Sequence, residues 1–106
     1  MKREEQLKVN ALVNAEFNSA VDEWLQTPDN WKRLLSCQAW VQETENYYIL
    51  KSYNTIIACI NKNSDTLFDA LRTEYGYTAT SAQHIAKFNH VYGRDKWGCH
   101  NRYTAR

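Results

Sequence analysis

Proline and glycine are scarce in this chain. One Pro and three Gly in 106 residues leave few positions for linkers, and Gly76, Gly93 and Gly98 stand too far apart to form a phosphate-binding glycine loop. The motifs G-x-S-x-G and H-E-x-x-H and the EF-hand loop are also missing from the sequence. These absences exclude the commonest nucleotide-binding and hydrolytic enzyme classes.

Cysteine and histidine are too scattered to predict a disulfide framework or a metal site. The three cysteines, an odd number, lie far apart and include no C-x-x-C pair. His84 and His90 are six positions apart, on opposite faces of a helix, and the adjacent Cys99 and His100 do not easily converge on one ion. We therefore expect no metal, no cofactor and reduced cysteines, as in a cytosol.

Long apolar runs are missing as well. No stretch approaches the roughly 18 apolar residues of a membrane span, and the N-terminal MKREE has no hydrophobic region behind its charges. The 43% of hydrophobic and 13% of aromatic residues supply one core, and the length leaves no room for a second domain. The sequence predicts a single cytoplasmic domain over residues 1–106 that does not enter a membrane.

Neither sign of charge dominates, because the formal net charge is +1. Such a balance creates no global field that attracts nucleic acid or membrane. Basic residues nevertheless gather at the C-terminal end, where five of them stand against the single acid Asp95 from residue 87 onward.

Apolar periodicity predicts a long N-terminal helix over residues 4–26. Val9, Val13 and Phe17 recur at four-residue steps, the spacing of an amphipathic helix. An alternation at period two also runs through this segment, but its Ala content and lack of turn residues favour the helix. Thr27 and Pro28 resemble the N-cap and first position of a second, shorter helix.

The middle of the chain is rich in β-branched and aromatic residues. Residues 47–53 and 55–60 are predicted strands joined at Asn54, which tolerates the left-handed backbone of a tight turn. Residues 66–71 favour a third antiparallel strand, although a helix capped by Ser64 or Asp65 also fits them. A final helix is expected from residues 78–81 to about Tyr92, with Gly93 ending it.

Together these elements predict an α+β domain. It has two N-terminal helices, a small antiparallel sheet of two to three strands, a C-terminal helix and a basic tail. The apolar residues expected to share one core are Phe17, Val21, Trp24, Leu34, Ile49, Ile57, Ile85 and Phe88.

The segment YGYTATSAQH, residues 75–84, is a candidate binding loop. A hydroxyl-rich helix N-terminus presents free N–H groups to an anion such as a phosphate or a carboxylate, although one hydroxyl is enough to cap a helix. The candidate binding residues of this loop are Tyr75, Tyr77, Thr78, Thr80, Ser81 and His84.

The best catalytic arrangement in the sequence is Ser81 with His84, three positions apart on one helical face, oriented by Asp69 or Glu74. The simpler interpretation is that Ser81 caps the helix and His84 is an ordinary helix residue. Nothing in the sequence supplies an oxyanion site. We therefore expect that the protein is not an enzyme.

Downstream of this loop, cations alternate with aromatic residues. The candidate binding residues here are Lys87, Arg94, Lys96, Trp97 and Arg102. Such a composition is typical of a surface that tracks phosphates while stacking bases, and equally of a protein-interface hot spot. A solvated tail with packed aromatics also fits.

Two segments carry a resemblance to a known group. LKSYNT at residues 50–55 and YGYTATSAQHIAKF at residues 75–88 resemble a family of small, largely uncharacterised proteins from phages, plasmids and related mobile elements of Gram-positive bacteria. The resemblance extends over residues 48–92. It implies a genomic setting rather than a reaction, because it brings no catalytic residues with it.

That setting implies a protein that binds a machine of the bacterial host. The first hypothesis is a stoichiometric inhibitor of a host defence effector, or of its ribonucleoprotein complex, such as an anti-CRISPR protein acting on a CRISPR nuclease. The second is a nucleic-acid-binding regulator or accessory protein that uses the basic C-terminal segment. A hydrolase built on Ser81 and His84 is a distant third.

Overall fold

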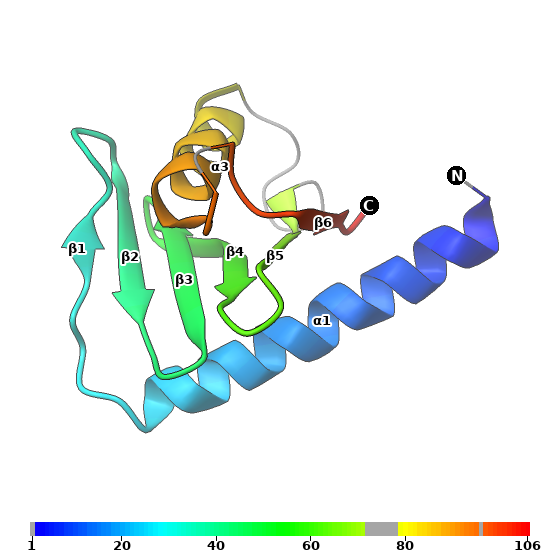
Figure 1. The fold of residues 1–106 in the computed structure, drawn as a ribbon, viewed down its shortest axis with the longest axis horizontal. Helices are drawn as coiled ribbons and strands as arrows, with labels where there is room; N and C mark the ends of the chain where they lie inside the picture. The colour runs from blue at the N-terminus through cyan, green and yellow to red at the C-terminus, as the bar shows by residue number, and fades with distance from the viewer. Residues whose placement is uncertain (1, 72–78, 96) are drawn as a thin grey trace.

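A computed structural model describes residues 2–71, 79–95 and 97–106 (Figure 1). These residues contain two long helices and six strands. In chain order the elements are α1 (Arg3–Leu25), β1 (Lys32–Arg33), β2 (Ala39–Glu43), β3 (Tyr47–Ser52), β4 (Thr55–Asn61), β5 (Thr66–Asp69), α3 (Ala79–Tyr92) and β6 (Asn101–Thr104).

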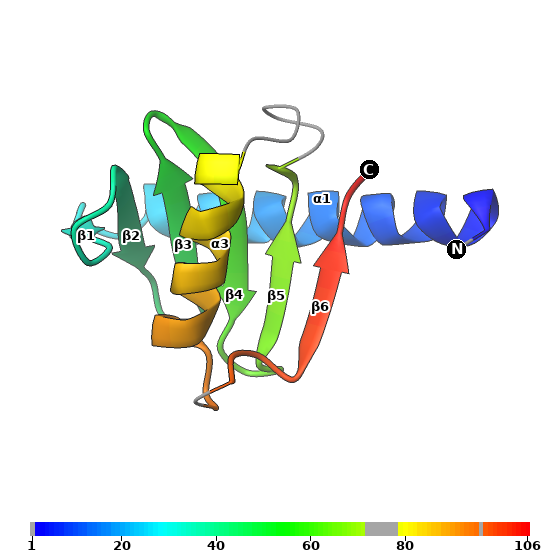
Figure 2. The ribbon, with the colours of Figure 1, turned by 90° about the horizontal axis from the view of Figure 1, so that it is seen from above.

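The strands form one sheet in the order β1-β2-β3-β4-β5-β6. Neighbouring strands are antiparallel except β5 and β6, which are parallel. Helix α1 runs across one face of the sheet and α3 packs on the other, so the fold has three layers (Figures 1 and 2). Helix α1 packs mainly on β3 to β6, which leaves the outer strands β1 and β2 less covered on that face.

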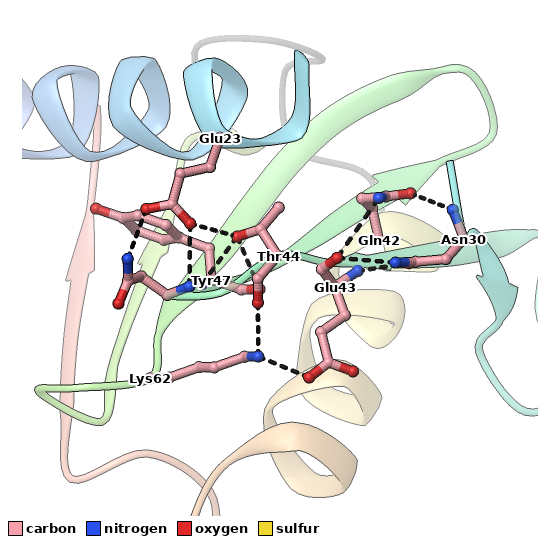
Figure 3. A network of polar contacts seen from close by, with 8 residues as sticks. Glu23, Asn30, Gln42, Glu43, Thr44, Tyr47 and Lys62 are labelled. Carbon is pink, nitrogen blue, oxygen red and sulfur yellow. Dashed lines mark hydrogen bonds and ion pairs between the residues drawn. The ribbon is translucent and has the colours of Figure 1, made fainter. Parts of the chain in front are cut away.

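The predicted two N-terminal helices and small two-to-three-strand sheet are wrong. The structure has a six-stranded mixed sheet, and the segment after Pro28 is extended and leads into β1. Asn30 explains this outcome, because its side chain pairs with the backbone of Glu43 as a neighbouring strand would. Asn30 Nδ2 donates to the Glu43 carbonyl, and Glu43 N–H donates to Asn30 Oδ1, both at 2.9 Å (Figure 3).

The end of α1 is tied to the turn between β2 and β3. The Glu23 carboxylate accepts hydrogen bonds from Thr44 Oγ1 at 2.8 Å and from the backbone and side-chain nitrogens of Asn46 at 3.0 and 2.9 Å (Figure 3). Burial opposes ionisation of Glu23, but these hydrogen bonds outweigh it and lower its pKa. The helix is therefore fixed to the sheet through polar contacts at its C-terminal end.

The expected single core is also wrong, because the sheet divides the apolar residues into two clusters. Leu34, Ile57, Ile85 and Phe88 lie in the cluster between the sheet and α3. Ile49 lies in the cluster under α1, against which the partly buried Phe17 and Trp24 pack. Successive residues of a strand point to opposite faces, so a sheet covered on both sides needs two cores.

Several local predictions are confirmed. The N-terminal helix, the two central strands and their turn, and the final helix ending before Gly93 all occur where expected. Residues Thr66–Asp69 are a strand, as favoured over the helix. Among the described residues, no helix has the length and apolar character needed to cross a membrane.

The predicted basic tail is instead strand β6, and Asp65 holds the loop that leads to it. The Asp65 carboxylate is buried and accepts hydrogen bonds from the backbone N–H groups of Arg94 at 3.0 Å and His100 at 3.2 Å. Asp65 itself has a positive φ of 49°, which Asp tolerates better than most residues. This carboxylate thus joins the start of β5 to both ends of the loop before β6.

Candidate functional site

The β3–β4 hairpin meets the first turns of α3 in a buried polar cluster. Ser52 Oγ lies 2.8 Å from Nδ1 of His84 and 3.3 Å from Oγ of Ser81. All three side chains are buried. We call these three residues the Ser–His cluster. It joins the two segments, 50–55 and 75–88, that are far apart in sequence and that carry the resemblance.

Burial keeps His84 in its neutral form. Removal from water disfavours the imidazolium and is the main reason that the pKa of His84 lies below its usual value, with the positive charge of Lys87 adding to the effect. A neutral imidazole has one donor and one acceptor nitrogen, so Nδ1 exchanges a single hydrogen bond with Ser52. The cluster therefore fastens the hairpin to α3 at neutral pH and below it, until the pH falls through the lowered pKa of His84.

A serine within hydrogen-bond distance of a histidine is also the geometry of an activated nucleophile. Here Ser52 is 0% exposed, so a substrate has no access to its hydroxyl in this conformation. The sequence paired Ser81 with His84, but the histidine contacts Ser52, which the sequence analysis missed. Asp69, the predicted orienting carboxylate, instead accepts hydrogen bonds from Arg102 and Thr104, and Glu74 lies outside the described residues.

The lowered pKa of His84 predicts that the protein loses stability as the pH falls below about 6.5. In that range the unfolded chain binds a proton that the folded chain excludes, so acid favours unfolding until the folded-state pKa is passed. We expect the wild-type melting temperature to be lower at pH 5.5 than at pH 7.5. His84→Asn, which keeps a polar atom near the Nδ1 position, should show a smaller drop.

The exposed His90 offers a matched control. His90→Asn removes an imidazole from the same helix but should retain the full wild-type decrease in melting temperature between the two pH values. An undiminished decrease in His84→Asn would contradict the assignment of this pH dependence to the Ser–His cluster.

On the opposite face of the sheet from this cluster, a row of cationic and aromatic side chains crosses three strands. The register pairs Arg33 of β1 with Trp40 of β2, and Trp40 with Lys51 of β3. Directly paired residues share one face of a sheet, so the ring lies between the two cations. The three residues stand on the α1 side of the sheet, at the edge that α1 covers least.

Trp31 extends this row toward α1. Lys51 Nζ lies 4.3 Å from the centre of the Trp31 ring and 5.9 Å from that of Trp40, both within the range of cation–π attraction. The Trp24 and Trp31 rings pack edge to face with their centres 5.3 Å apart. The two rings therefore hold the lysine in place, and Trp24 of α1 packs against Trp31.

Two exposed apolar residues border the row in strained backbone conformations. Leu35 and Tyr53 have φ values of 52° and 53°, in the left-handed region that bulky side chains rarely adopt. They are 61% and 48% exposed. The two turns that hold them are joined, because Tyr53 N–H donates to the Gln38 carbonyl at 2.9 Å. Residues in strained backbone conformations cluster at binding and active sites, and here the strain holds an apolar side chain in solvent.

Tyr53 also connects the row to the Ser–His cluster, since its ring centre lies 5.9 Å from that of His84. An open hollow of about 350 Å³ lies between Tyr53, Asn54, Lys51 and the two tryptophans of the row. We call the group Trp31, Arg33, Trp40, Lys51 and Tyr53 the basic–aromatic surface.

The cations of this surface are not neutralised within the described part of the chain. The ion pairs there are Lys62 with Glu43, His100 with Asp65, and Arg102 with Asp69. Arg33 donates through Nε to the Cys37 carbonyl at 2.8 Å, a contact that orients its guanidinium without cancelling its charge. The surface is therefore a locally positive region on a protein of nearly zero net charge.

Several predicted site residues lie outside the described residues, namely Tyr75, Tyr77, Thr78 and Lys96. Of the rest of the predicted loop, Thr80 is exposed in the first turn of α3, whereas Ser81 and His84 are buried in the Ser–His cluster. The sequence therefore located part of a real cluster but assigned its buried members to an exposed binding loop.

The predicted basic segment is dispersed by the fold. Arg94 donates to the Lys62 carbonyl and Arg102 pairs with the buried Asp69. Trp97 is 82% exposed in the loop beyond α3. Lys87 lies elsewhere on α3, where its ammonium donates to Cys37 Sγ at 3.3 Å. The described residues of this segment are thus divided among α3, the following loop and β6, and Arg94 and Arg102 already have acceptors within the protein.

Comparison with known proteins identifies a family. A model described as "Family of unknown function (DUF8033)" matches residues 24–104. Neither a curated protein nor a solved structure matches the chain. The matched region includes the Ser–His cluster and the basic–aromatic surface and leaves out most of α1. The chain therefore belongs to the DUF8033 family, whose function is unknown.

Proposed function

We propose that this protein is a non-enzymatic binding protein of phages and related mobile elements, which inhibits a host defence effector such as a CRISPR nuclease by occupying part of it. The partner is the effector protein or its ribonucleoprotein complex, in the cytoplasm of the bacterial host. The proposed setting rests on the resemblance of segments 50–55 and 75–88 to mobile-element proteins.

The observation that supports a binding role is the basic–aromatic surface. The few residues that provide most of the binding energy at protein interfaces are enriched in tryptophan, tyrosine and arginine. Here Trp40, Tyr53 and Arg33 gather at one edge of the fold. Paired strands and the Ser–His cluster hold them, so little conformational entropy is lost on binding. The positive charges of Arg33 and Lys51 also favour an anionic partner over a cationic one.

The test is a titration of DNA cleavage by a purified, guide-loaded CRISPR nuclease with this protein. A stoichiometric inhibitor should abolish cleavage near one equivalent. Complete inhibition at a small fraction of an equivalent would mean that the protein turns over and would contradict a non-enzymatic role. Unchanged cleavage by nucleases from Gram-positive hosts at a large excess would contradict the choice of effector.

Two tryptophan variants decide which surface makes the contact. Trp40→Ala should weaken inhibition by about 30-fold, as expected for loss of an interface hot spot of roughly 2 kcal/mol. Trp97→Ala is the matched control, since it removes an exposed tryptophan from the C-terminal segment that the sequence had favoured. A larger loss of inhibition in Trp97→Ala than in Trp40→Ala would mean that the C-terminal segment makes the contact.

A further inference from the structure

We infer that the basic–aromatic surface binds single-stranded nucleic acid, with bases stacked on Trp40 and Tyr53 and phosphates held by Arg33 and Lys51. This inference rests on the proposed function in one respect: it assigns a ligand class to the surface that the function uses. It moves nucleic-acid binding away from the C-terminal segment, where the fold disperses the cations.

The row supplies charge on both sides of a ring. Arg33, Trp40 and Lys51 stand on adjacent strands, so the Cα atoms of the two cationic residues are separated by two strand spacings, roughly 10 Å. A base stacked on the central ring then has a cation beside it in each direction along the row. Single-strand-binding surfaces combine these two elements, a positive track and aromatic platforms.

The aromatic rings of the surface have different roles. Trp31 contacts both the Lys51 ammonium and the Trp24 ring, and therefore supports the site from within. Trp40 is half-buried and Tyr53 is 48% exposed, and both line the open hollow. These two rings offer the faces on which a base can stack.

Three features select the ligand. The Lys51 ammonium already occupies the cation site between the rings, which disfavours a cationic partner such as a lysine-rich peptide. Arg33 and Lys51, which form no ion pair with the residues that the structure describes, favour an anion. The aromatic faces favour an anion that carries planar groups. In a duplex the base faces are stacked inside the helix, so a single strand fits and a double strand does not.

Asn54 marks where the site ends. It borders both this hollow and a second one along α1 that is lined by the acidic Asp22. A phosphate backbone is repelled from that side, which leaves the path along the row toward β1. The path ends at Arg33, because β1 is the edge strand of the sheet.

The experiment measures binding of fluorescein-labelled 12-mers of oligo(dT) and oligo(U) to the full chain at 50 and 200 mM salt. Each phosphate contact on a single strand contributes a slope of about −0.7 to log affinity against log salt. Arg33→Gln with Lys51→Met removes both charges but keeps side-chain volume, and should flatten the slope by about 1.4. Lys2→Gln with Lys8→Gln is the matched control. It changes the net charge equally at the remote N-terminal end of α1 and should leave the slope unchanged.

Stacking is tested separately from charge. Trp40→Ala should weaken binding about tenfold without changing the salt slope, whereas Trp97→Ala should leave affinity unchanged. An oligomer of abasic sugar phosphates should bind at least tenfold more weakly than oligo(dT). Better binding of oligo(U) than of oligo(dT) would assign the natural ligand to RNA, and the reverse would assign it to DNA, both within the inferred class.

Photocrosslinking of a bromouracil-containing 12-mer to the wild-type protein avoids any dependence on the variants folding. Crosslinks to peptides containing Trp40 or Tyr53 support the inference, and crosslinks confined to Trp97 overturn it. Absence of binding at 50 mM salt, equal binding of the abasic oligomer or of polyglutamate, or equal sensitivity to the Lys2 and Lys8 changes also overturn it.

Failure of this inference and failure of the proposed function give different results. If oligonucleotides bind at the row but the protein does not inhibit DNA cleavage by the nucleases, the proposed function is contradicted and the inference is supported. If the protein inhibits the nuclease stoichiometrically, binds no oligonucleotide, and still inhibits after Arg33→Gln with Lys51→Met, the inference is contradicted and the proposed function is supported.

Discussion

Truncation of Phe88 to Ala is expected to lower the free energy of unfolding by about 3 to 5 kcal/mol. Phe88 is 0% exposed and lies in the cluster between α3 and the sheet, with its ring centre 5.7 Å from that of Tyr92. The change leaves a cavity that the paired strands beneath cannot close. For a domain of this size we expect the melting temperature to fall by more than about 10 °C, as measured by circular dichroism.

Phe17→Ala is the matched control on the other face of the sheet. The two residues are equivalent in a sequence-based core, but Phe17 is only half-buried under α1. We therefore expect Phe17→Ala to lower the free energy of unfolding by about half as much as Phe88→Ala. Equal losses in urea titrations would contradict the difference in burial between the two faces.

The parts of the fold that could be predicted are those encoded by neighbouring residues. Helix α1 has apolar residues at helical spacing, and β3 and β4 are two apolar segments around a turn at Asn54. Helix α3 ends before Gly93, as a helix followed by glycine commonly does. In each case the local pattern and the tertiary environment favour the same conformation.

The missed strands are those that depend on distant partners. Strand β1 has two residues, and β6 is a polar segment of four residues, NRYT, so neither shows a β pattern in the sequence. Strand β6 forms because Asp65 fixes the loop before it, and the extended segment before β1 forms because Asn30 pairs with Glu43. The Thr27 and Pro28 pattern predicted a helix there, and the tertiary contacts overrode it.

The candidate site shows the same division. The sequence identified Ser81 and His84 but not Ser52, because the hydrogen bond between strand and helix depends on how the two elements pack. Similarly, Arg33, Trp40 and Lys51 form a row only through the strand register. The C-terminal cations were visible in the sequence, but their acceptors, such as the buried Asp69, were not.

Asp65→Ala is expected to lower the free energy of unfolding by about 2 to 6 kcal/mol, because two backbone N–H groups, those of Arg94 and His100, lose their acceptor. A hydrogen bond to a charged group contributes about 1.5 to 3 kcal/mol, and the partial exposure of these two donors reduces that contribution. The positive φ of this position adds strain for alanine. The loss should appear first in the loop before β6, as faster amide hydrogen exchange of residues 94–104.

Asp65→Asn is the conservative control, since it keeps one acceptor oxygen and tolerates the left-handed backbone; we expect about half the loss. Burial opposes ionisation of Asp65, but its backbone hydrogen bonds outweigh this and lower its pKa. A lowered carboxyl pKa stabilises the folded state above about pH 4 and ceases to do so as the pH falls through the folded-state value. The difference in free energy of unfolding between wild type and Asp65→Ala should therefore become smaller in acid.

The Asp65→Asn variant also tests which segment binds nucleic acid. Strands β6 and β1 are opposite edges of the sheet, so this variant should destabilise β6 but still bind oligonucleotide with wild-type affinity. A parallel loss of binding would mean that the C-terminal segment, and not the basic–aromatic surface, holds the ligand.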